Sequence, residues 1–324
     1  GGIPPAFRNV ITSDFYMQLG GNMSVRSIRA DQNASIHTND DLTVLGNSFL
    51  VEGYGTYSGE SYVSDQQLDN FQPNVDTNGP DSNVFWQPPI DIKEINIANL
   101  IEDAATSGSY INTVNGLTLA INGNDLPEPN VLDFTRPSTW PWDTEVYPYY
   151  YNCDSGSCGT ADNPFIMVVK QNLALSGRIE VKGYGVIVSE GNVSIEGGNG
   201  GSSGGGIFGE LTDEKETKLM VASMNTLTLN GNSCLGLGPQ NGSENQHCTS
   251  SNGEFTHGTT LYAEDQITFR GTPYIVGGIV AKNSTYDDVG NPTIYWGSPT
   301  EAITDPGFEF ITPIGPILIA YSEF

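Results

Sequence analysis

Short segments in which apolar and polar residues alternate recur along this chain, and each of them ends in glycine. Two copies, NLALSG at residues 172–177 and NVSIEG at residues 192–197, lie twenty residues apart. The four other copies, DLTVLG, TLAING, TLTLNG and QITFRG, end at Gly46, Gly123, Gly231 and Gly271. Strict alternation places the apolar side chains on one face of a β-strand, and the closing glycine permits the positive φ of a sharp turn. The six segments therefore predict six short strands, each followed by a turn.

A strand of this length cannot bury its apolar face alone, but copies that stack side by side can. A repeat of about twenty residues is typical of such stacking. We therefore predict a mainly β fold, a right-handed parallel β-helix or solenoid with long loop excursions and one flanking helix. We expect a single domain over residues 1–324, with insertions at about 61–112, 124–164 and 198–218. A β-sandwich with Greek-key connections is the alternative architecture.

The flanking helix is predicted within IDIKEINIANLIEDAATSG, residues 90–108. Asp91 is suited to capping its start, alanine and glutamate favour helix, and Gly108 marks its end. We expect this helix to pack on one flank of the solenoid.

Composition narrows the choice of partners. The 324 residues include 12 Lys and Arg against 38 Asp and Glu, which gives a formal net charge of −26. Such a charge repels nucleic acid and anionic membrane surfaces, so we expect neither as a partner. No run is apolar and long enough to cross a bilayer, so we expect no membrane span in this chain.

Four cysteines lie in loops rich in Gly, Ser and Asn. The sequence has no Cys-x-x-Cys pair and only three histidines, which argues against a zinc site. We predict disulfides between Cys153 and Cys158 and between Cys234 and Cys248, one of three possible connectivities. Disulfides indicate an oxidising compartment, and therefore an extracellular or cell-surface location. Four unpaired, buried thiols are the alternative.

Calcium is the one candidate cofactor. Asp76, Asn78 and Asp81 lie in DTNGPDSN, and Asp287 and Asp288 lie in TYDDVGN. Both are glycine-containing loops with clustered oxygen ligands, the kind of donor that Ca²⁺ prefers. Ordinary polar turns are the alternative interpretation of both segments.

Aromatic residues gather in the proline-interrupted run from Trp140 to Tyr151. Trp140, Trp142 and Tyr149 are candidates for stacking on sugar rings if they are exposed. Packing of these aromatics over the apolar side of the solenoid is the alternative, and we favour it.

Catalytic residues are not evident in the sequence. Arg178, Glu180 and Lys182 alternate along one strand and share a face, as a polysaccharide lyase would require, while Ile179 and Val181 take the other face. Opposite charges alternating on a strand more often form a solvated ladder. We therefore assign no catalytic residue.

Three longer phrases carry a resemblance to a known family. They are HTNDDLTVLGNS, NLALSGRIEVKGYGVIVSEGNVSIEG and TLYAEDQITFRGTPYIVGGIVAKN. They resemble the extracellular β-solenoid region of PilX-like type IV pilus-associated proteins, and bactofilin-like solenoids share some of these phrases. The resemblance implies a structural role at the cell surface or in a filament, without catalytic residues to carry over.

Together these observations favour a non-enzymatic extracellular structural protein, a pilus-associated or filament-forming surface subunit with adhesive capacity. Its expected partners are other protein subunits, further copies of itself, or surface glycans. The alternative is a polysaccharide-active β-helix enzyme, a lyase or hydrolase, or a carbohydrate-binding surface protein. We also expect residues 308–324 to pair as strands with the solenoid body and the N-terminal segment to make contacts outside the monomer.

Overall fold

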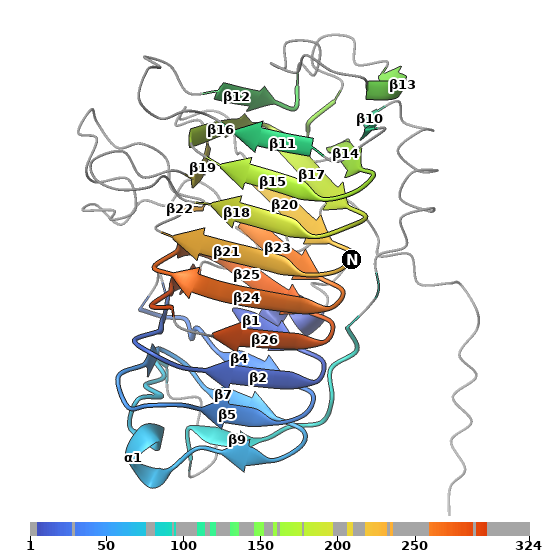
Figure 1. The fold of residues 1–324 in the computed structure, drawn as a ribbon. Helices are drawn as coiled ribbons and strands as arrows, with labels where there is room; N and C mark the ends of the chain where they lie inside the picture. The colour runs from blue at the N-terminus through green and yellow to red at the C-terminus, as the bar shows by residue number, and fades with distance from the viewer. Residues whose placement is uncertain are drawn as a thin grey trace, which may run out of the picture.

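The computed structural model describes residues 5–27, 30–75, 82–92, 94, 109–113, 117–120, 130–135, 146–151, 158–160, 163–176, 178–196, 206–209, 218–231, 234–235, 259–287 and 290–296. Almost all of them belong to short strands, or to the turns between strands, that stack in layers (Figure 1). Each full layer contributes one strand to each of three faces, here named A, B and C.

Face B is a sheet of nine parallel strands. From one end of the stack to the other they are β11 (Leu117–Ala120), β15 (Leu173–Ser176), β18 (Val193–Glu196), β21 (Leu227–Gly231), β24 (Gln266–Gly271), β26 (Ser284–Asp287), β2 (Tyr16–Leu19), β5 (Leu42–Val44) and β8 (Ser61–Tyr62).

Face A follows the same order. Its strands are β10 (Ser109–Thr113), β14 (Phe165–Val169), β17 (Tyr184–Ser189), β20 (Lys218–Ser223), β23 (Thr259–Ala263), the second half of β25 (Tyr274–Ala281), β1 (Ile11–Ser13), β4 (Ile36–Thr38), β7 (Gly55–Tyr57) and β9 (Val84–Trp86). Strand β13 (Val146–Tyr151) pairs with β10 and makes the one antiparallel ladder among the described strands.

Face C consists of β12 (Asn130–Asp133), β16 (Arg178–Lys182), β19 (Gly206–Gly209), β22 (Cys234–Leu235), the first half of β25, β27 (Thr293–Trp296), β3 (Ser24–Ser27) and β6 (Leu50–Val51). Strand β25 thus passes from face C to face A. It bends at Gly277, whose φ is +146° and whose backbone lies so close to Thr259 that a side chain there would collide with it.

These parallel sheets confirm the prediction of a mainly β protein. All six alternating segments lie on face B, in β5, β11, β15, β18, β21 and β24. Of the closing glycines, Gly46, Gly231 and Gly271 are described, and their φ angles of +88°, +68° and +98° confirm the predicted turns.

The twenty-residue spacing corresponds to one layer, since Leu173 pairs in register with Val193. The forty-residue spacing corresponds to one layer as well, because Leu227 pairs directly with Ile267. Spacing alone therefore did not reveal how many layers separate two segments.

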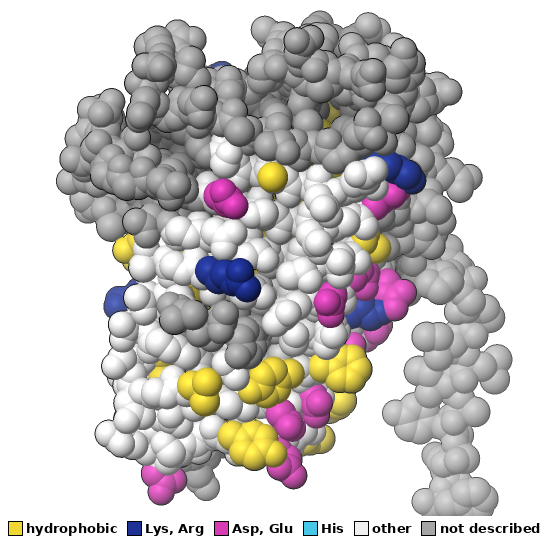
Figure 2. Space-filling model, viewed as in Figure 1, with side chains coloured by type: hydrophobic (Ala, Val, Ile, Leu, Met, Phe, Trp, Pro, Cys, Tyr) yellow, Lys and Arg dark blue, Asp and Glu magenta, His cyan; other side chains and the backbone are white. Residues whose placement is uncertain are grey.

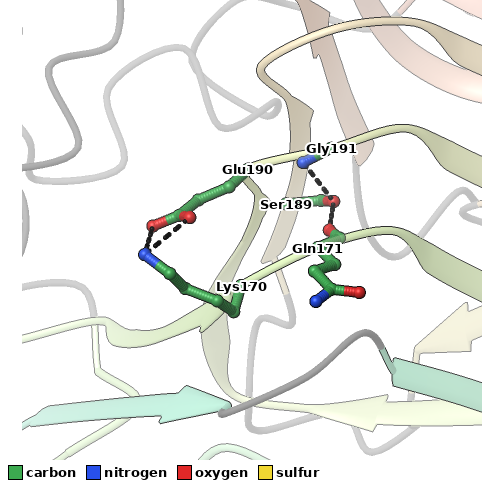
Figure 3. A network of polar contacts seen from close by, with 5 residues as sticks. All are labelled: Lys170, Gln171, Ser189, Glu190 and Gly191. Carbon is green, nitrogen blue, oxygen red and sulfur yellow. Dashed lines mark hydrogen bonds and ion pairs between the residues drawn. The ribbon is translucent and has the colours of Figure 1, made fainter.

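The interior of the stack is filled by the inward side chains of all three faces. Leucine, isoleucine, valine, phenylalanine and methionine dominate it, and most are less than 3% exposed. At the corner between faces A and B, small polar side chains take over. Ser189 Oγ donates to the carbonyl oxygen of Gln171 in the previous layer (2.5 Å) and accepts the N–H of Gly191 (3.2 Å), as Figure 3 shows. Beside them Lys170 pairs with Glu190 across the same two layers (2.9 Å).

Ser223 repeats this corner one layer further on. Its hydroxyl donates to the carbonyl oxygen of Gly191 (2.8 Å) and accepts the N–H of Asn225 (3.1 Å). A serine or threonine at this position therefore satisfies backbone groups that the strands leave unpaired, and it ties neighbouring layers together.

The order of the layers does not follow the order of the chain. Strands β1 and β2 lie within the stack and not at one of its ends (Figure 1), and β1, β2 and β3 pair there with β25, β26 and β27. We call residues 5–86 the N-terminal unit, residues 109–296 the C-terminal unit, and the three strand pairings between them the seam.

The chain leaves the N-terminal unit at its far end and returns along face A. Gln87 bonds to Tyr57, Ile90 exchanges two hydrogen bonds with the Asn39 side chain (both 2.6 Å), and Glu94 forms an ion pair with Lys282. These partners follow β7, β4 and β25 in turn, so the segment runs along the stack from the N-terminal unit to the C-terminal unit.

The predicted helix begins in this returning segment. Its described residues, Ile90, Asp91, Ile92 and Glu94, are not helical, and its remaining residues lie outside the described ones. Ile92 does pack on a flank. It belongs to a second apolar cluster, which consists of outward side chains of face A covered by Ala6, Phe7, Ile90 and Ile92. Ala6 and Phe7 are thus buried within the monomer, although we expected the N-terminal segment to contact other molecules.

The far end of the N-terminal unit is capped. The short helix α1 (Asp65–Leu68), which the sequence analysis did not predict, directs the Gln67 amide onto the carbonyl oxygens of Val44 (3.2 Å) and Gly46 (2.7 Å). Phe71 follows it, fully buried and edge-on to Phe49 with ring centroids 5.4 Å apart. The Gln67 amide therefore satisfies carbonyl groups at the end of β5, and residues 70–72 pair with the edge of β6, which would otherwise be open.

The three segments that we expected as insertions also contain strands of the stack. Strands β8, β9 and all but the last residue of β10 fall within residues 61–112, β12 and β13 within 124–164, and β19 within 198–218. Residues 308–324 lie outside the described ones.

Candidate functional site

Exposed large apolar side chains mark the N-terminal unit. Among the described residues they are Phe15, Leu45, Tyr62 and Trp86, between 50% and 57% exposed. Figure 2 shows apolar and acidic side chains gathered over β2 and β5, at the lower end of face B in this view. A concentration of exposed apolar groups on one part of a surface is a sign of an interaction site.

Three of them, Phe15, Tyr62 and Trp86, lie with Tyr16 and three acidic residues on successive layers at the corner between faces A and B. We call this group the aromatic–acidic patch, and it consists of Phe15, Tyr16, Asp40, Asp41, Glu60, Tyr62 and Trp86. Leu45 follows the other end of β5 and lies outside the patch.

Register places the patch residues in successive layers. Met17 N–H donates to the carbonyl of Asp41, and Leu42 N–H donates to that of Glu60, so Tyr16, Asp41 and Glu60 occupy equivalent positions. Phe15 and Asp40 precede two of them. Layers are about 4.8 Å apart, so the patch runs about 14 Å along the stack from the Phe15 layer to the β9 layer.

The corner hydroxyl of Thr38 fixes two members of the patch. It donates to the carbonyl of Phe15 (2.8 Å) and accepts the N–H of Asp40 (3.3 Å), the same arrangement that Ser189 and Ser223 make elsewhere. The backbone beneath the patch is therefore held as rigidly as the rest of the stack.

Hydrogen bonds orient the side chains of the patch. Tyr62 Oη donates to Glu60 Oε2 (2.6 Å), and the N–H of Glu60 donates to Asp41 Oδ1 (2.8 Å). Trp86 Nε1 donates to the carbonyl of Ser58 (2.9 Å), which fixes one edge of the indole and leaves the ring largely exposed.

The carboxylates repel one another. Partial desolvation raises the pKa of Asp40, and the charge of Asp41 and a hydrogen bond with it raise that pKa further. The pKa of Tyr62 is raised by its hydrogen bond to Glu60, then by the charge of Glu60 and, more weakly, by Asp41 and Asp40. The patch thus combines aromatic faces with a concentrated negative potential, which suits ligands that present C–H groups together with hydroxyl or ammonium donors.

None of the predicted calcium ligands can be assigned to a site. Asp76, Asn78, Asp81 and Asp288 lie outside the described residues, and Asp287 is described only as the last residue of β26. Within the described part of the chain, no group of three or more His, Cys, Asp or Glu side chains is arranged to hold a metal ion.

The predicted sugar-stacking residues lie apart from the patch. Trp140 and Trp142 are outside the described residues, and Tyr149 is placed by its backbone alone, in β13 opposite Ile111. Their stacking role stays a prediction.

Cys158 is buried and disulfide-bonded. The side chains of Cys153, Cys234 and Cys248 lie outside the described ones, so the predicted connectivity stays a prediction.

The charged trio on β16 is described only in part. Ile179 and Val181 are buried, as the alternation predicts, and Lys182 is half-buried, whereas the side chains of Arg178 and Glu180 lie outside the described ones.

Sequence reasoning missed the aromatic–acidic patch. Tyr62 and Trp86 belong to a stretch that was interpreted as a polar insertion, and Phe15 belongs to a strand without the closing-glycine phrase. The available sequence signal was the alternation Leu42-Thr43-Val44, which marks Thr43 as outward-facing. The register of β5 and β8 then places Tyr62 directly beside Thr43 on the outer side of face B.

No helix among the described residues has the length and apolar character needed to cross a membrane. The chain matches no family model, no curated protein and no solved structure.

Proposed function

We propose that this protein is a non-enzymatic extracellular surface protein that binds glycans through the aromatic–acidic patch. The observation that carries the proposal is that three exposed aromatic side chains and three carboxylates lie on successive layers of one corner of the stack, where Tyr62 is bonded to Glu60. Sugar rings stack on aromatic faces, and their hydroxyls donate to carboxylates.

The scaffold favours binding because little has to be ordered. Trp86 and Tyr62 are each held by a hydrogen bond, and the backbone beneath them is paired on successive layers. A preformed surface loses less conformational entropy when it binds. We propose that the whole stack is a right-handed β-solenoid, which would present this corner as a stiff edge.

Charge selects the class of glycan. The chain carries a formal net charge of −26, and Asp40, Asp41 and Glu60 concentrate negative charge at the patch itself. Uronic acid polymers are therefore repelled, whereas neutral and amino-sugar glycans are not. The proposed ligands are neutral or cationic saccharides.

The disulfide at Cys158 supports an extracellular or cell-surface location, since disulfides persist in oxidising compartments. The strand phrases shared with PilX-like proteins support association with a pilus or filament. A surface subunit that binds glycans would be adhesive.

A polysaccharide-active enzyme is the second candidate, because the patch holds three carboxylates, those of Asp40, Asp41 and Glu60, on adjacent layers. Paired carboxylates, one with a raised pKa, are the groups that glycoside hydrolases use. The two functions differ in outcome, because an enzyme releases shorter saccharides and a binding protein does not.

Co-sedimentation with insoluble polymers, followed by analysis of the released sugars, tests both candidates. We expect the protein to sediment with chitin or chitosan but not with alginate or pectin gels, and to release no oligosaccharide. Depolymerisation would establish the enzyme. Absence of binding to every neutral and cationic polymer would overturn the glycan proposal.

A further inference from the structure

The seam joins parts of the chain that are far apart in sequence. Ser13 Oγ donates to Thr285 Oγ1 (2.6 Å), although the two residues are 272 positions apart. Backbone bonds cross the seam on faces A and B, from Ile279 to the carbonyl of Val10 (2.7 Å) and from Phe15 to the carbonyl of Asn283 (2.8 Å).

The seam is as well formed as a join between consecutive layers. Strand β3 pairs four residues with β27 across the seam but only two with β6 on its other side. Inward side chains on both sides are fully buried, among them Ile11 and Met17 from one unit and Ile279 and Ile294 from the other. Separated units would each expose an apolar layer end and a row of unpaired strand edges.

One covalent connection holds the two units together, the segment of residues 87–108. All four cysteines lie in the part of the chain that follows this segment, so no disulfide links the units. A second copy of the chain offers the same strands in the same register. It can therefore satisfy the seam as completely as the chain's own N-terminal unit does.

We propose that the seam is a strand-exchange interface, through which the N-terminal unit of one copy completes the stack of another. Reciprocal exchange gives a dimer, and serial exchange gives a linear assembly in which each stack contains parts of two chains. The connecting segment raises the local concentration of the chain's own unit, so the closed monomer dominates in dilute solution and exchange is favoured at high protein concentration. The inference does not depend on what the aromatic–acidic patch binds.

The length of the connection provides the test. Asn39 holds Ile90 at the layer of β4, and seven layer steps of about 4.8 Å, about 34 Å in all, separate that layer from β10. Nineteen residue steps from Ile90 to Ser109 reach this easily. Deletion of residues 96–107 leaves seven steps, which span at most about 25 Å.

The deletion variant therefore cannot close its own seam at Ile90's present position, although the deletion removes no residue of either unit. We expect light scattering to show a dimer or larger assembly with the β-sheet circular dichroism of the wild type. The matched control replaces residues 96–107 with a Gly/Ser segment of equal length, and it should remain a monomer. A folded, monomeric deletion variant would overturn the proposal.

A second measurement decides the matter even if the deletion variant does not fold. A protease site is placed in the Gly/Ser control, the purified protein is cleaved, and light and heavy isotope-labelled samples are mixed. After a cycle of denaturation and refolding at high concentration, native mass spectrometry should find light N-terminal units paired with heavy C-terminal units. If no paired units re-form, or only unmixed pairs do, the seam is not an exchange interface.

Discussion

Faces A and B are built from strands of the same layers, yet their outer surfaces differ. In the C-terminal unit the outward side chains of face A are mostly apolar and buried, for example Val168, Val188 and Met220, and they form the second apolar cluster. On face B the outward side chains are small and polar, such as Ser194 and Thr228, and they are half-exposed. The stack therefore has one face that is covered and one that meets solvent.

This difference explains which strands the sequence revealed. A strand that is buried on both sides is apolar throughout, as FIMVV at residues 165–169 is. In a strand with one solvent-exposed side, apolar residues alternate with polar or small ones, as in LALS at residues 173–176. It also indicates where ligands can bind. The outer side of face A is covered by residues of the same chain, among them Phe7 and Ile92, whereas the aromatic side chains at the edge of face B are open to a ligand.

Introducing a carboxylate on the outer side of each face should give the largest difference in stability between the two faces. Val188→Asp buries a carboxylate among apolar side chains without a partner, and we expect it to lower the free energy of unfolding by about 3–5 kcal/mol. Thr228→Asp places the same group on the outer side of face B, where about 1 kcal/mol or less is expected. Urea unfolding of both variants measures the difference. Equal losses would show that face A is not a buried surface.

The closing glycines give a smaller contrast between two layers of face B. Gly271→Ala combines a positive φ with collision against the backbone of Gly231, 2.8 Å from the added Cβ, and should cost about 2–3 kcal/mol. Gly46→Ala has a positive φ but open space around it, so about 1 kcal/mol is expected. Thermal unfolding ranks the two variants, and a larger loss for Gly46→Ala would contradict the packing described here.

Acid should act on face A through His37. This side chain is fully buried between Thr56 and Asn39, and burial lowers its pKa below the ordinary value of 6.5, against a smaller opposing effect of the Asn39 hydrogen bond. The unfolded chain then binds the proton more readily. Stability is therefore complete above pH 6.5 and declines as the pH falls from 6.5 towards the lowered pKa, by less than about 1.4 kcal/mol per pH unit.

His37→Gln is the control, because it removes the titrating group. Unfolding by urea between pH 7.5 and 5 should show a steeper loss of stability in the wild type than in this variant. Parallel curves would mean that His37 titrates alike in the folded and unfolded chain.

The smallest effect on stability is expected at the aromatic–acidic patch. Trp86 is 57% exposed, and its Nε1 makes the hydrogen bond described above to the carbonyl of Ser58. Trp86→Ala should therefore change the free energy of unfolding by about 0.5 kcal/mol or less. A loss as large as that of Val188→Asp would instead assign Trp86 to the packing of the fold.

Local pattern was sufficient to predict six of the nine strands of face B and the turns at Gly46, Gly231 and Gly271, because alternation and closing glycines are properties of neighbouring residues. It did not predict that the layer of β1–β3 packs beneath that of β25–β27, since any layer end with the same apolar interior is an acceptable neighbour. The aromatic–acidic patch was not predicted from the sequence for a related reason. Phe15, Asp41 and Tyr62 come from three different layers, and only the register of the sheets places them together.

Titration calorimetry with a soluble chito-oligosaccharide tests the central claim, that this patch binds glycans. The double variant Trp86→Ala, Tyr62→Ala should bind at least about tenfold more weakly than the wild type, which corresponds to about 1.4 kcal/mol. Leu45→Ala is the matched control, because Leu45 is equally exposed in the same unit but lies outside the patch, and it should bind as the wild type does. An oligosaccharide affinity that is the same in the double variant as in the wild type would contradict the account.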